Sequence, residues 1–132
     1  MKNKFGFILI KPQLGENIGA CARSLKNFGF SKLHIVSPKQ SWPNNKAKAT
    51  SVGAYDVIKR AKIYNNTYDA ISDFNIVISL SARKRDINKK HISINQFLKI
   101  IKSKKNTKFG LMFGPEASGL SNDDLSLSNF VL

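Results

Sequence analysis

FGFILI at residues 5–10 and GENIGACAR at residues 15–23 decide the fold class of this 132-residue chain. The first stretch is a short apolar run that predicts a buried strand, and the second opens a helix with one apolar face. The residues of this face are Ile18, Cys21, Ala22, Leu25 and Phe28. Asn17 is a good N-cap for such a helix, and Gly29 is a good residue to end it. The stretch therefore predicts a strand followed by a helix, the repeating unit of α/β domains.

The same alternation continues along the chain. Apolar runs predict further strands at residues 33–36, within 57–64, and at 74–79, 109–113 and 129–132. Helical spacing predicts helices at residues 47–54, 69–73 and 94–102, with a further helix start at 122–124. Strands that alternate with helices predict one α/β domain over residues 1–132, with a mostly parallel sheet flanked by helices.

Three loops follow predicted strand ends, at residues 11–17, 80–86 and 114–120. In open parallel sheets, ligands gather at the carboxyl ends of the strands. The first loop leads into a helix N-terminus, which can receive an anion. The middle loop places small residues before three cations, and the last holds one acid between glycines. Simpler interpretations stay open for the three loops in turn: a helix cap with a solvated arginine, a basic solvent loop, and a turn with a solvated glutamate.

The chain is strongly basic. It has 22 Lys and Arg residues against 8 Asp and Glu, for a net charge of +14 and a pI of about 10.1. A charge of this size suggests a polyanion as partner. Genome composition is the alternative explanation, because Lys, Asn and Ile can all be encoded by AT-rich codons.

Several classes of protein are excluded by composition. Cys21 is the single cysteine, which rules out an internal disulfide and an all-cysteine metal site. His34 and His91 lie far apart without a carboxylate or cysteine at metal spacing, so no metal is expected. The longest apolar run, residues 7–10, is far shorter than the ~20 residues of a membrane span. No secretory signal is visible at residues 1–5. We therefore expect a cytoplasmic protein with no membrane partner.

Taken together, these segments resemble the SpoU/TrmH branch of the SPOUT superfamily of knotted RNA methyltransferases. The resemblance is closest to the TrmJ-type tRNA (cytidine/uridine-2′-O-)-methyltransferases. Asn17 and Arg23 match the first motif of the family, and residues 114–120 match the second. Residues 81–85 (SARKR) resemble a Thr-Ser-Ala-Arg segment of the subfamily, in which Leu80 stands where threonine is usual. The resemblance covers nearly the whole chain and implies an α/β fold with a deep trefoil knot at its C-terminal end.

The resemblance also implies a cofactor, a substrate and a site. The cofactor is S-adenosyl-L-methionine, the methyl acceptor is a ribose 2′-hydroxyl of RNA, and the protein works as a homodimer. The implied cofactor-binding residues are Leu80, Ser81, Ala82, Gly114 and Leu132. The implied catalytic residues are Arg23, Asn17 and Glu116, and the implied RNA-binding residues are Arg23, Arg83, Lys84 and Arg85.

Arg23 needs a physical assignment of its role. A guanidinium stays protonated at any physiological pH, so Arg23 is expected to stabilise the developing alkoxide or to anchor the neighbouring phosphate. Glu116 is the rival base if its carboxylate reaches the hydroxyl. Asn17 and Glu116 are otherwise expected to order the site.

The third motif of the family, a Pro-rich turn followed by Ser-Leu-Asn on a helix, is not found before Leu132. An incomplete knot-forming segment is therefore expected. The expected function is transfer of a methyl group from S-adenosyl-L-methionine to a ribose 2′-oxygen, on a pyrimidine in a tRNA anticodon loop. The alternatives are an RNA-binding remnant without catalysis and a decayed chain with no specific role.

Overall fold

A single parallel sheet forms the centre of the molecule. The computed structural model describes residues 2–81 and 88–132. Seven strands within these ranges pair in parallel in the order β3-β2-β1-β6-β4-β7-β5. The strands are β1 (Phe5–Ile10), β2 (Leu33–Val36), β3 (Lys62–Tyr64), β4 (Ile76–Leu80), β5 (Lys90–His91), β6 (Phe109–Phe113) and β7 (Phe130–Val131). The α/β class with a parallel sheet is therefore confirmed.

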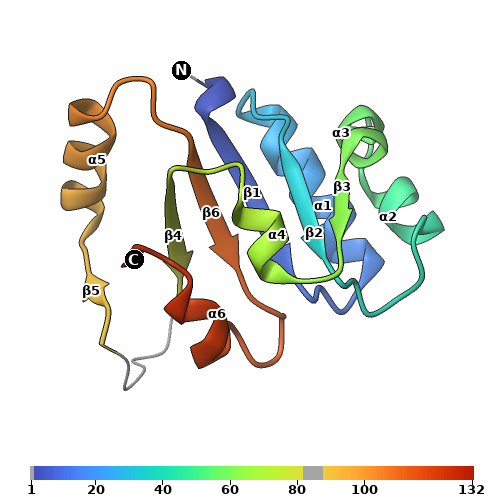
Figure 1. The fold of residues 1–132 in the computed structure, drawn as a ribbon. Helices are drawn as coiled ribbons and strands as arrows, with labels where there is room; N and C mark the ends of the chain where they lie inside the picture. The colour runs from blue at the N-terminus through green and yellow to red at the C-terminus, as the bar shows by residue number, and fades with distance from the viewer. Residues whose placement is uncertain (1, 82–87) are drawn as a thin grey trace.

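Helices cover both faces of the sheet (Figure 1). One face carries α1 (Gly15–Asn27), α2 (Asn45–Thr50), α3 (Tyr55–Arg60) and α5 (Ile94–Ser103). The other face carries the shorter α4 (Thr67–Ile71) and α6 (Asn122–Ser126), which bury Ala70 and Leu125 against β1 and β6. A 3₁₀ turn, η1 (Lys2–Lys4), precedes β1. None of the helices in the described ranges has the length and apolar character needed to cross a bilayer.

Helix α1 begins earlier than its sequence predicts. The N-cap position is Leu14 rather than Asn17, and no side chain caps the helix there. Asn17 lies instead in the first turn, where its side chain is free to bond elsewhere. The other end is as predicted: Gly29 has a φ of 82°, its N–H donates to Lys26 O at 2.9 Å, and Phe30 N–H donates to Leu25 O at 2.8 Å. This pair of bonds is a Schellman motif.

The segment between β2 and β3 holds two short helices, where the sequence predicted one short helix at residues 47–54 and a short strand within 57–64. α2 begins at Asn45 because the Asn44 side chain accepts the N–H of Ala47 at 3.0 Å. α3 then occupies much of the stretch 57–64, and only Lys62–Tyr64 is a strand. Val57 and Ile58 are buried against α1 and β2, so packing of these apolar side chains favours a helix over a longer strand.

Two paired glycines make room for Phe74 on the sheet. Gly6 and Gly110 are register partners on β1 and β6. A Cβ at Gly6 would overlap the Phe74 ring, and a Cβ at Gly110 would lie 2.9 Å from Phe74 Cδ2. Phe74 therefore packs flat over both strands. The strand predicted at 74–79 accordingly begins later, at Ile76.

Candidate functional site

Four neighbouring strands, β1, β6, β4 and β7, end at the same edge of the sheet. Phe113 at the end of β6 pairs with Leu9 of β1 on one side and with Leu80 of β4 on the other. Val131 of β7 pairs with Ser79 of β4. The loops after β1 and β6 therefore lie together at this carboxyl edge, next to the ends of β4 and β7, as the parallel topology predicts.

Glu116 joins the loop after β6 to the loop after β1. Its carboxylate accepts the Gln13 N–H at 2.9 Å, the Leu14 N–H at 3.0 Å and the Asn17 side-chain amide at 2.8 Å. In return, Ala117 N–H donates to the Gln13 side-chain oxygen at 2.8 Å. Two segments more than 100 residues apart are fixed to each other by these bonds. Asn17 and Glu116, both predicted as site residues, are thus in direct contact.

The hydrogen bonds decide the protonation state of Glu116. Partial burial acts to raise the pKa of its carboxyl group, but the Gln13 N–H and the Asn17 amide favour the charged form more strongly. The net result is a pKa below the ordinary value of 4.5. Glu116 is therefore an anion at neutral pH and already accepts three donors. A carboxylate in this state is a weak base, and its geometry fits a positioning role.

Gly114 allows the loop after β6 to fold back on itself. A Cβ at Gly114 would overlap backbone atoms of Gly119 and Leu120. The turn is held by the Gly119 N–H, which donates to Pro115 O at 2.9 Å, and Gly119 itself has a φ of 70°. Backbone atoms cannot move aside as a flexible side chain can, so this position requires glycine.

Three of the predicted cofactor residues, Leu80, Ser81 and Leu132, lie at the ends of β4 and β7. Leu132 N–H donates to Ser79 O at 2.8 Å, and Ser81 N–H donates to Leu132 O at 3.3 Å. Leu80 and Leu132 are half-buried. Backbone polar groups and partly open apolar side chains are therefore combined at one edge, as in small-molecule sites. The predicted residues Ala82, Arg83, Lys84 and Arg85 lie outside the described residues.

Arg23 lies on the exposed surface of α1. It follows Asn17 by six positions, which is about 9 Å along the helix axis. No described contact joins Arg23 to Asn17 or Glu116, and within the described ranges it forms no ion pair. The guanidinium is therefore available to an anionic ligand that approaches along α1.

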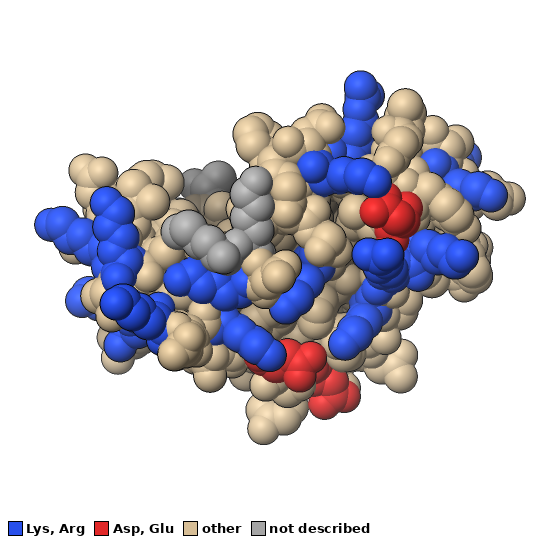
Figure 2. All heavy atoms as spheres, turned by 90° about the horizontal axis from the view of Figure 1, so that it is seen from above, with Lys and Arg blue, Asp and Glu red and all other residues tan. Residues whose placement is uncertain are grey.

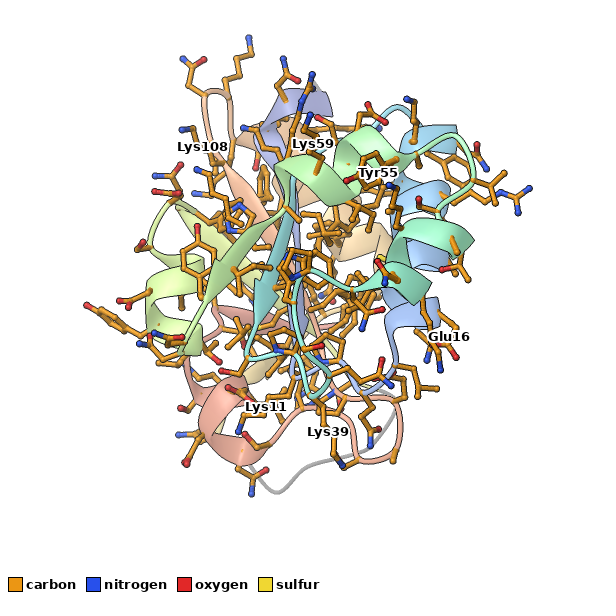
Figure 3. The ribbon with its side chains drawn as sticks, turned by 90° about the vertical axis from the view of Figure 1, so that its right-hand side faces the viewer. Lys11, Glu16, Lys39, Tyr55, Lys59 and Lys108 are labelled. Atoms are coloured by element: carbon orange, nitrogen blue, oxygen red, sulfur yellow. The ribbon has the colours of Figure 1, made fainter. Side chains whose placement is uncertain are left out.

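Sequence reasoning missed part of this edge. A cleft of about 290 Å³ is lined by Lys11, Gln13, Ser37, Lys39 and Pro115. Lys11 and Ser37 both have positive φ values, 47° and 44°, directly after β1 and β2. Figure 3 shows Lys11 and Lys39 at this end of the molecule, opposite Lys59 and Lys108. The available signal was a lysine next to proline after each of two strands, in Lys11-Pro12 and Pro38-Lys39.

The loops after β1 and β2 are tied together. Lys39 N–H donates to Pro12 O at 3.0 Å, and Gly15 N–H donates to the Gln40 side-chain oxygen at 2.9 Å. Within the described residues no cluster of His, Cys, Asp or Glu could hold a metal ion. Burial raises the pKa of the Cys21 thiol to about 11, so this thiol is protonated and unreactive at neutral pH. The chemistry of the edge therefore depends on cations, amides and backbone groups.

An α/β domain with a parallel sheet and a glycine-dependent loop at its carboxyl edge belongs to a common class of ligand-binding proteins. Comparison with known proteins identifies the family within this class. Residues 4–132 match the model of the SpoU rRNA Methylase family. The chain belongs to this family.

Relatives with assigned names support the same identification. The chain is 39% identical over 122 residues to the tRNA (cytidine-2′-O-)-methyltransferase TrmJ of Methanocaldococcus jannaschii, covering 89% of this chain and 52% of the relative. It is 31% identical to the tRNA (cytidine/uridine-2′-O-)-methyltransferase TrmJ of Sodalis glossinidius, covering 98% and 51%. The chain thus spans about half the length of the curated relatives that it matches.

Solved structures confirm the SPOUT-type α/β fold. The crystal structure of TrmJ from Z. mobilis matches with a TM-score of 0.88 and 36% identity, covering 96% of this chain and 56% of that one. A probable methylase family protein from Haemophilus influenzae matches with a TM-score of 0.90 and 30% identity, covering 100% and 55%. The trefoil knot itself stays a prediction.

Proposed function

We propose that this chain provides the catalytic domain of an S-adenosyl-L-methionine-dependent RNA ribose 2′-O-methyltransferase. The observation that carries the proposal is the Asn17–Glu116 contact, which joins the two motif loops at the edge where Gly114 and Leu80 also lie. Family membership and the names of the relatives support it. The homologous enzymes are named for methylation of cytidine or uridine in tRNA, so we assign a pyrimidine ribose of tRNA as substrate, in the anticodon loop.

The residues at the edge fit S-adenosyl-L-methionine. Half-buried Leu80 and Leu132 offer apolar contact for an adenine or a thioether chain, and nearby backbone groups offer polar contact. When bound, the cofactor supplies an electrophilic methyl group on a sulfonium. Gly114 allows the loop after β6 to fold back on itself at the end of the strand, next to Leu80 of β4.

The protein residues have separate roles in the proposed reaction. Glu116 and Asn17 hold the loops after β1 and β6 in register. Arg23 binds the substrate phosphate or stabilises the negative charge that develops on the 2′-oxygen as its proton leaves. Glu116 is disfavoured as the base because its carboxylate is engaged by three donors and its pKa is lowered.

Two further assignments belong to the proposal. The enzyme works as a homodimer, as the resemblance to knotted methyltransferases implies, and it acts in the cytoplasm, where tRNA is modified. Sedimentation of the chain with and without S-adenosyl-L-methionine tests the dimer directly. A monomer under both conditions contradicts it.

The function is tested by calorimetric titration of S-adenosyl-L-methionine, followed by methyl transfer to tRNA transcripts with the product mapped by mass spectrometry. Arg23→Lys keeps a positive charge but loses the planar guanidinium, so tRNA binding is retained while methyl transfer falls about 100-fold. Ser24→Ala, an exposed neighbour on α1, is the matched control and retains activity. Near-normal turnover in Arg23→Lys contradicts the role of Arg23. RNA binding without cofactor binding points to a non-catalytic RNA-binding chain.

A further inference from the structure

A second cleft lies at the opposite, amino edge of the sheet. It has a volume of about 360 Å³ and lies where β2, β3, β4 and β6 begin. Its four cations come from three separate places in the sequence: Lys32, Arg60 with Lys62, and Lys108. This cleft has no part in the proposed methyl transfer, because the six residues of β1 place about 20 Å between the two edges.

The cations of this cleft are not neutralised by the protein. Among the described residues the ion pair is Lys26–Asp56, which lies outside the cleft. One carboxylate, that of Asp73, lines the cleft with the four cations, and it forms no ion pair with them. A concave surface with excess positive charge of this kind concentrates anions.

The floor of the cleft is rigid. Phe74 is packed over Gly6 and Gly110, and the His34 ring lies between Phe74 at 5.2 Å and Tyr64 at 5.3 Å. His34 is only 6% exposed, and burial lowers its pKa, so its ring is neutral at pH 7. Its Nδ1 has no hydrogen-bond partner among the described residues. The positive charge therefore comes from the long side chains at the rim.

The rim is held in place by backbone hydrogen bonds. Lys108 N–H donates to the Asn75 side-chain oxygen at 2.8 Å, and Asn75 N–H donates to Lys108 O at 2.8 Å. This reciprocal pair fixes the start of β6 next to the start of β4. Lys108 is therefore presented from a fixed backbone position, although its side chain is exposed.

The charge continues beyond the cleft along the same edge. Lys4, Lys105 and Lys108 line an adjoining surface hollow. Figure 2 looks onto this edge and shows Lys and Arg side chains spread across it, with Asp and Glu confined to small groups. A single small anion would occupy only the cleft, whereas a chain of phosphates would match the whole band of cations.

We infer that the amino edge binds the phosphodiester backbone of the RNA substrate, at a distance from the nucleotide that is methylated. Contacts to phosphates supply affinity and orientation rather than sequence recognition. The inference rests on the proposed function only in taking RNA as the polyanion. When a folded RNA places its reacting ribose at the carboxyl edge, another part of its backbone reaches the amino edge.

The first test removes three cations and compares two variants. One carries Arg60→Gln, Lys62→Gln and Lys108→Gln, and its control carries Lys46→Gln, Lys90→Gln and Lys99→Gln, which are exposed positions on α2, β5 and α5. Affinity for a tRNA transcript is measured by fluorescence anisotropy over a salt series. The slope of log affinity against log salt should fall by about 2 in the first variant, since each lost phosphate contact removes about 0.7. Equal slopes in the two variants overturn the inference.

The second test uses the unmodified chain. Lysine acetylation with and without tRNA, read by mass spectrometry, should show protection of Lys32, Lys62 and Lys108. Protection confined to Lys11 and Lys39 overturns this inference and leaves the proposed function standing. Protection at the amino edge without methyl transfer upholds the inference while the proposed function fails. Absence of any tRNA binding overturns the inference.

Discussion

The two edges of the sheet are built by different means. At the carboxyl edge, loops are held by hydrogen bonds that converge on one carboxylate, as Glu116 accepts donors from Gln13, Leu14 and Asn17. At the amino edge, the Phe74 and His34 rings pack on the sheet, hydrogen bonds between Lys108 and Asn75 hold the rim, and the cations of the cleft have no carboxylate partner among the described residues. The carboxyl edge thus engages its carboxylate with donors from its own loops, while the amino edge gathers cations around a cleft without an ion-pair partner.

This difference between the two edges also explains why sequence motifs point to the carboxyl edge and not to the amino edge. The hydrogen bonds of Glu116 and Ala117 with Gln13, Leu14 and Asn17 form a clasp between two compact stretches of sequence, 13–17 and 113–120. The cations of the amino edge are scattered over residues 32–108, and only the fold brings them together. A site that is assembled from scattered residues can be recognised only when the strand order is known.

The largest expected effect is on the free energy of unfolding, when glycines near the two edges are replaced by alanine. Gly114→Ala forces a Cβ against backbone atoms and should lower the free energy of unfolding by about 3 kcal/mol. Gly110→Ala meets side-chain atoms of Phe74 and Ile8 that can shift, so its cost should be about 1–2 kcal/mol. Urea unfolding of both variants measures the difference. Equal losses would show that the two edges are equally rigid.

A smaller effect is expected from the clasp. Glu116→Gln leaves one donor of the loop after β1 without its charged acceptor, and because the site is exposed the cost should be about 1 kcal/mol at pH 7. The pKa of Glu116 is lowered in the folded state, so its contribution is present above pH 4.5 and is lost as the pH falls through the folded pKa. Urea unfolding at pH 7 and at pH 3 checks this. Asp123→Asn, an exposed acid on α6, is the control. If the difference in the free energy of unfolding between wild type and Glu116→Gln is as large at pH 3 as at pH 7, the lowered pKa of Glu116 is contradicted.

The smallest effect belongs to the amino edge. Burial lowers the pKa of His34 below 6.5, so the unfolded chain binds a proton there before the folded chain does. The free energy of unfolding should therefore fall as the pH decreases from 6.5 to the folded pKa. His34→Gln should flatten this part of the pH profile, measured by urea unfolding between pH 7 and pH 5. An unchanged slope in the variant would contradict a lowered pKa of His34 in the folded protein.

Much of the fold was predictable from the sequence, because its signals are local. The strand at residues 5–10, the strand at 109–113 and the Schellman end at Gly29 follow from apolar runs and a glycine. The start of α1 was misplaced because Asn17 bonds to Glu116 rather than to its own helix. A tertiary contact between residues 99 positions apart leaves no local signal.

The candidate site was predictable only in part. Asn17 and Glu116 were each predicted as site residues from two motifs, but their direct contact was not. The role of Gln13 depends on how the loops after β1 and β6 meet, and that of Lys39 on how the loops after β1 and β2 meet. The glycine pair Gly6 and Gly110 could not be explained from the sequence, since the Phe74 ring that fills the space comes from elsewhere in the chain.

The position of β6 has a consequence for the order in which this protein is made. β6 lies between β1 and β4, although it is synthesised after both. A nascent chain that has not yet released residue 109 from the ribosome holds β1 and β4 as two unpaired strand edges, which are prone to intermolecular pairing. The clasp between Gln13 and Glu116 closes later still, across 103 positions of sequence. Pairing of β6 with β1 and β4 and closure of the Gln13–Glu116 contact are therefore separated by only a few residues of synthesis, so the two strand edges are covered at nearly the same time as the carboxyl-edge loops are joined.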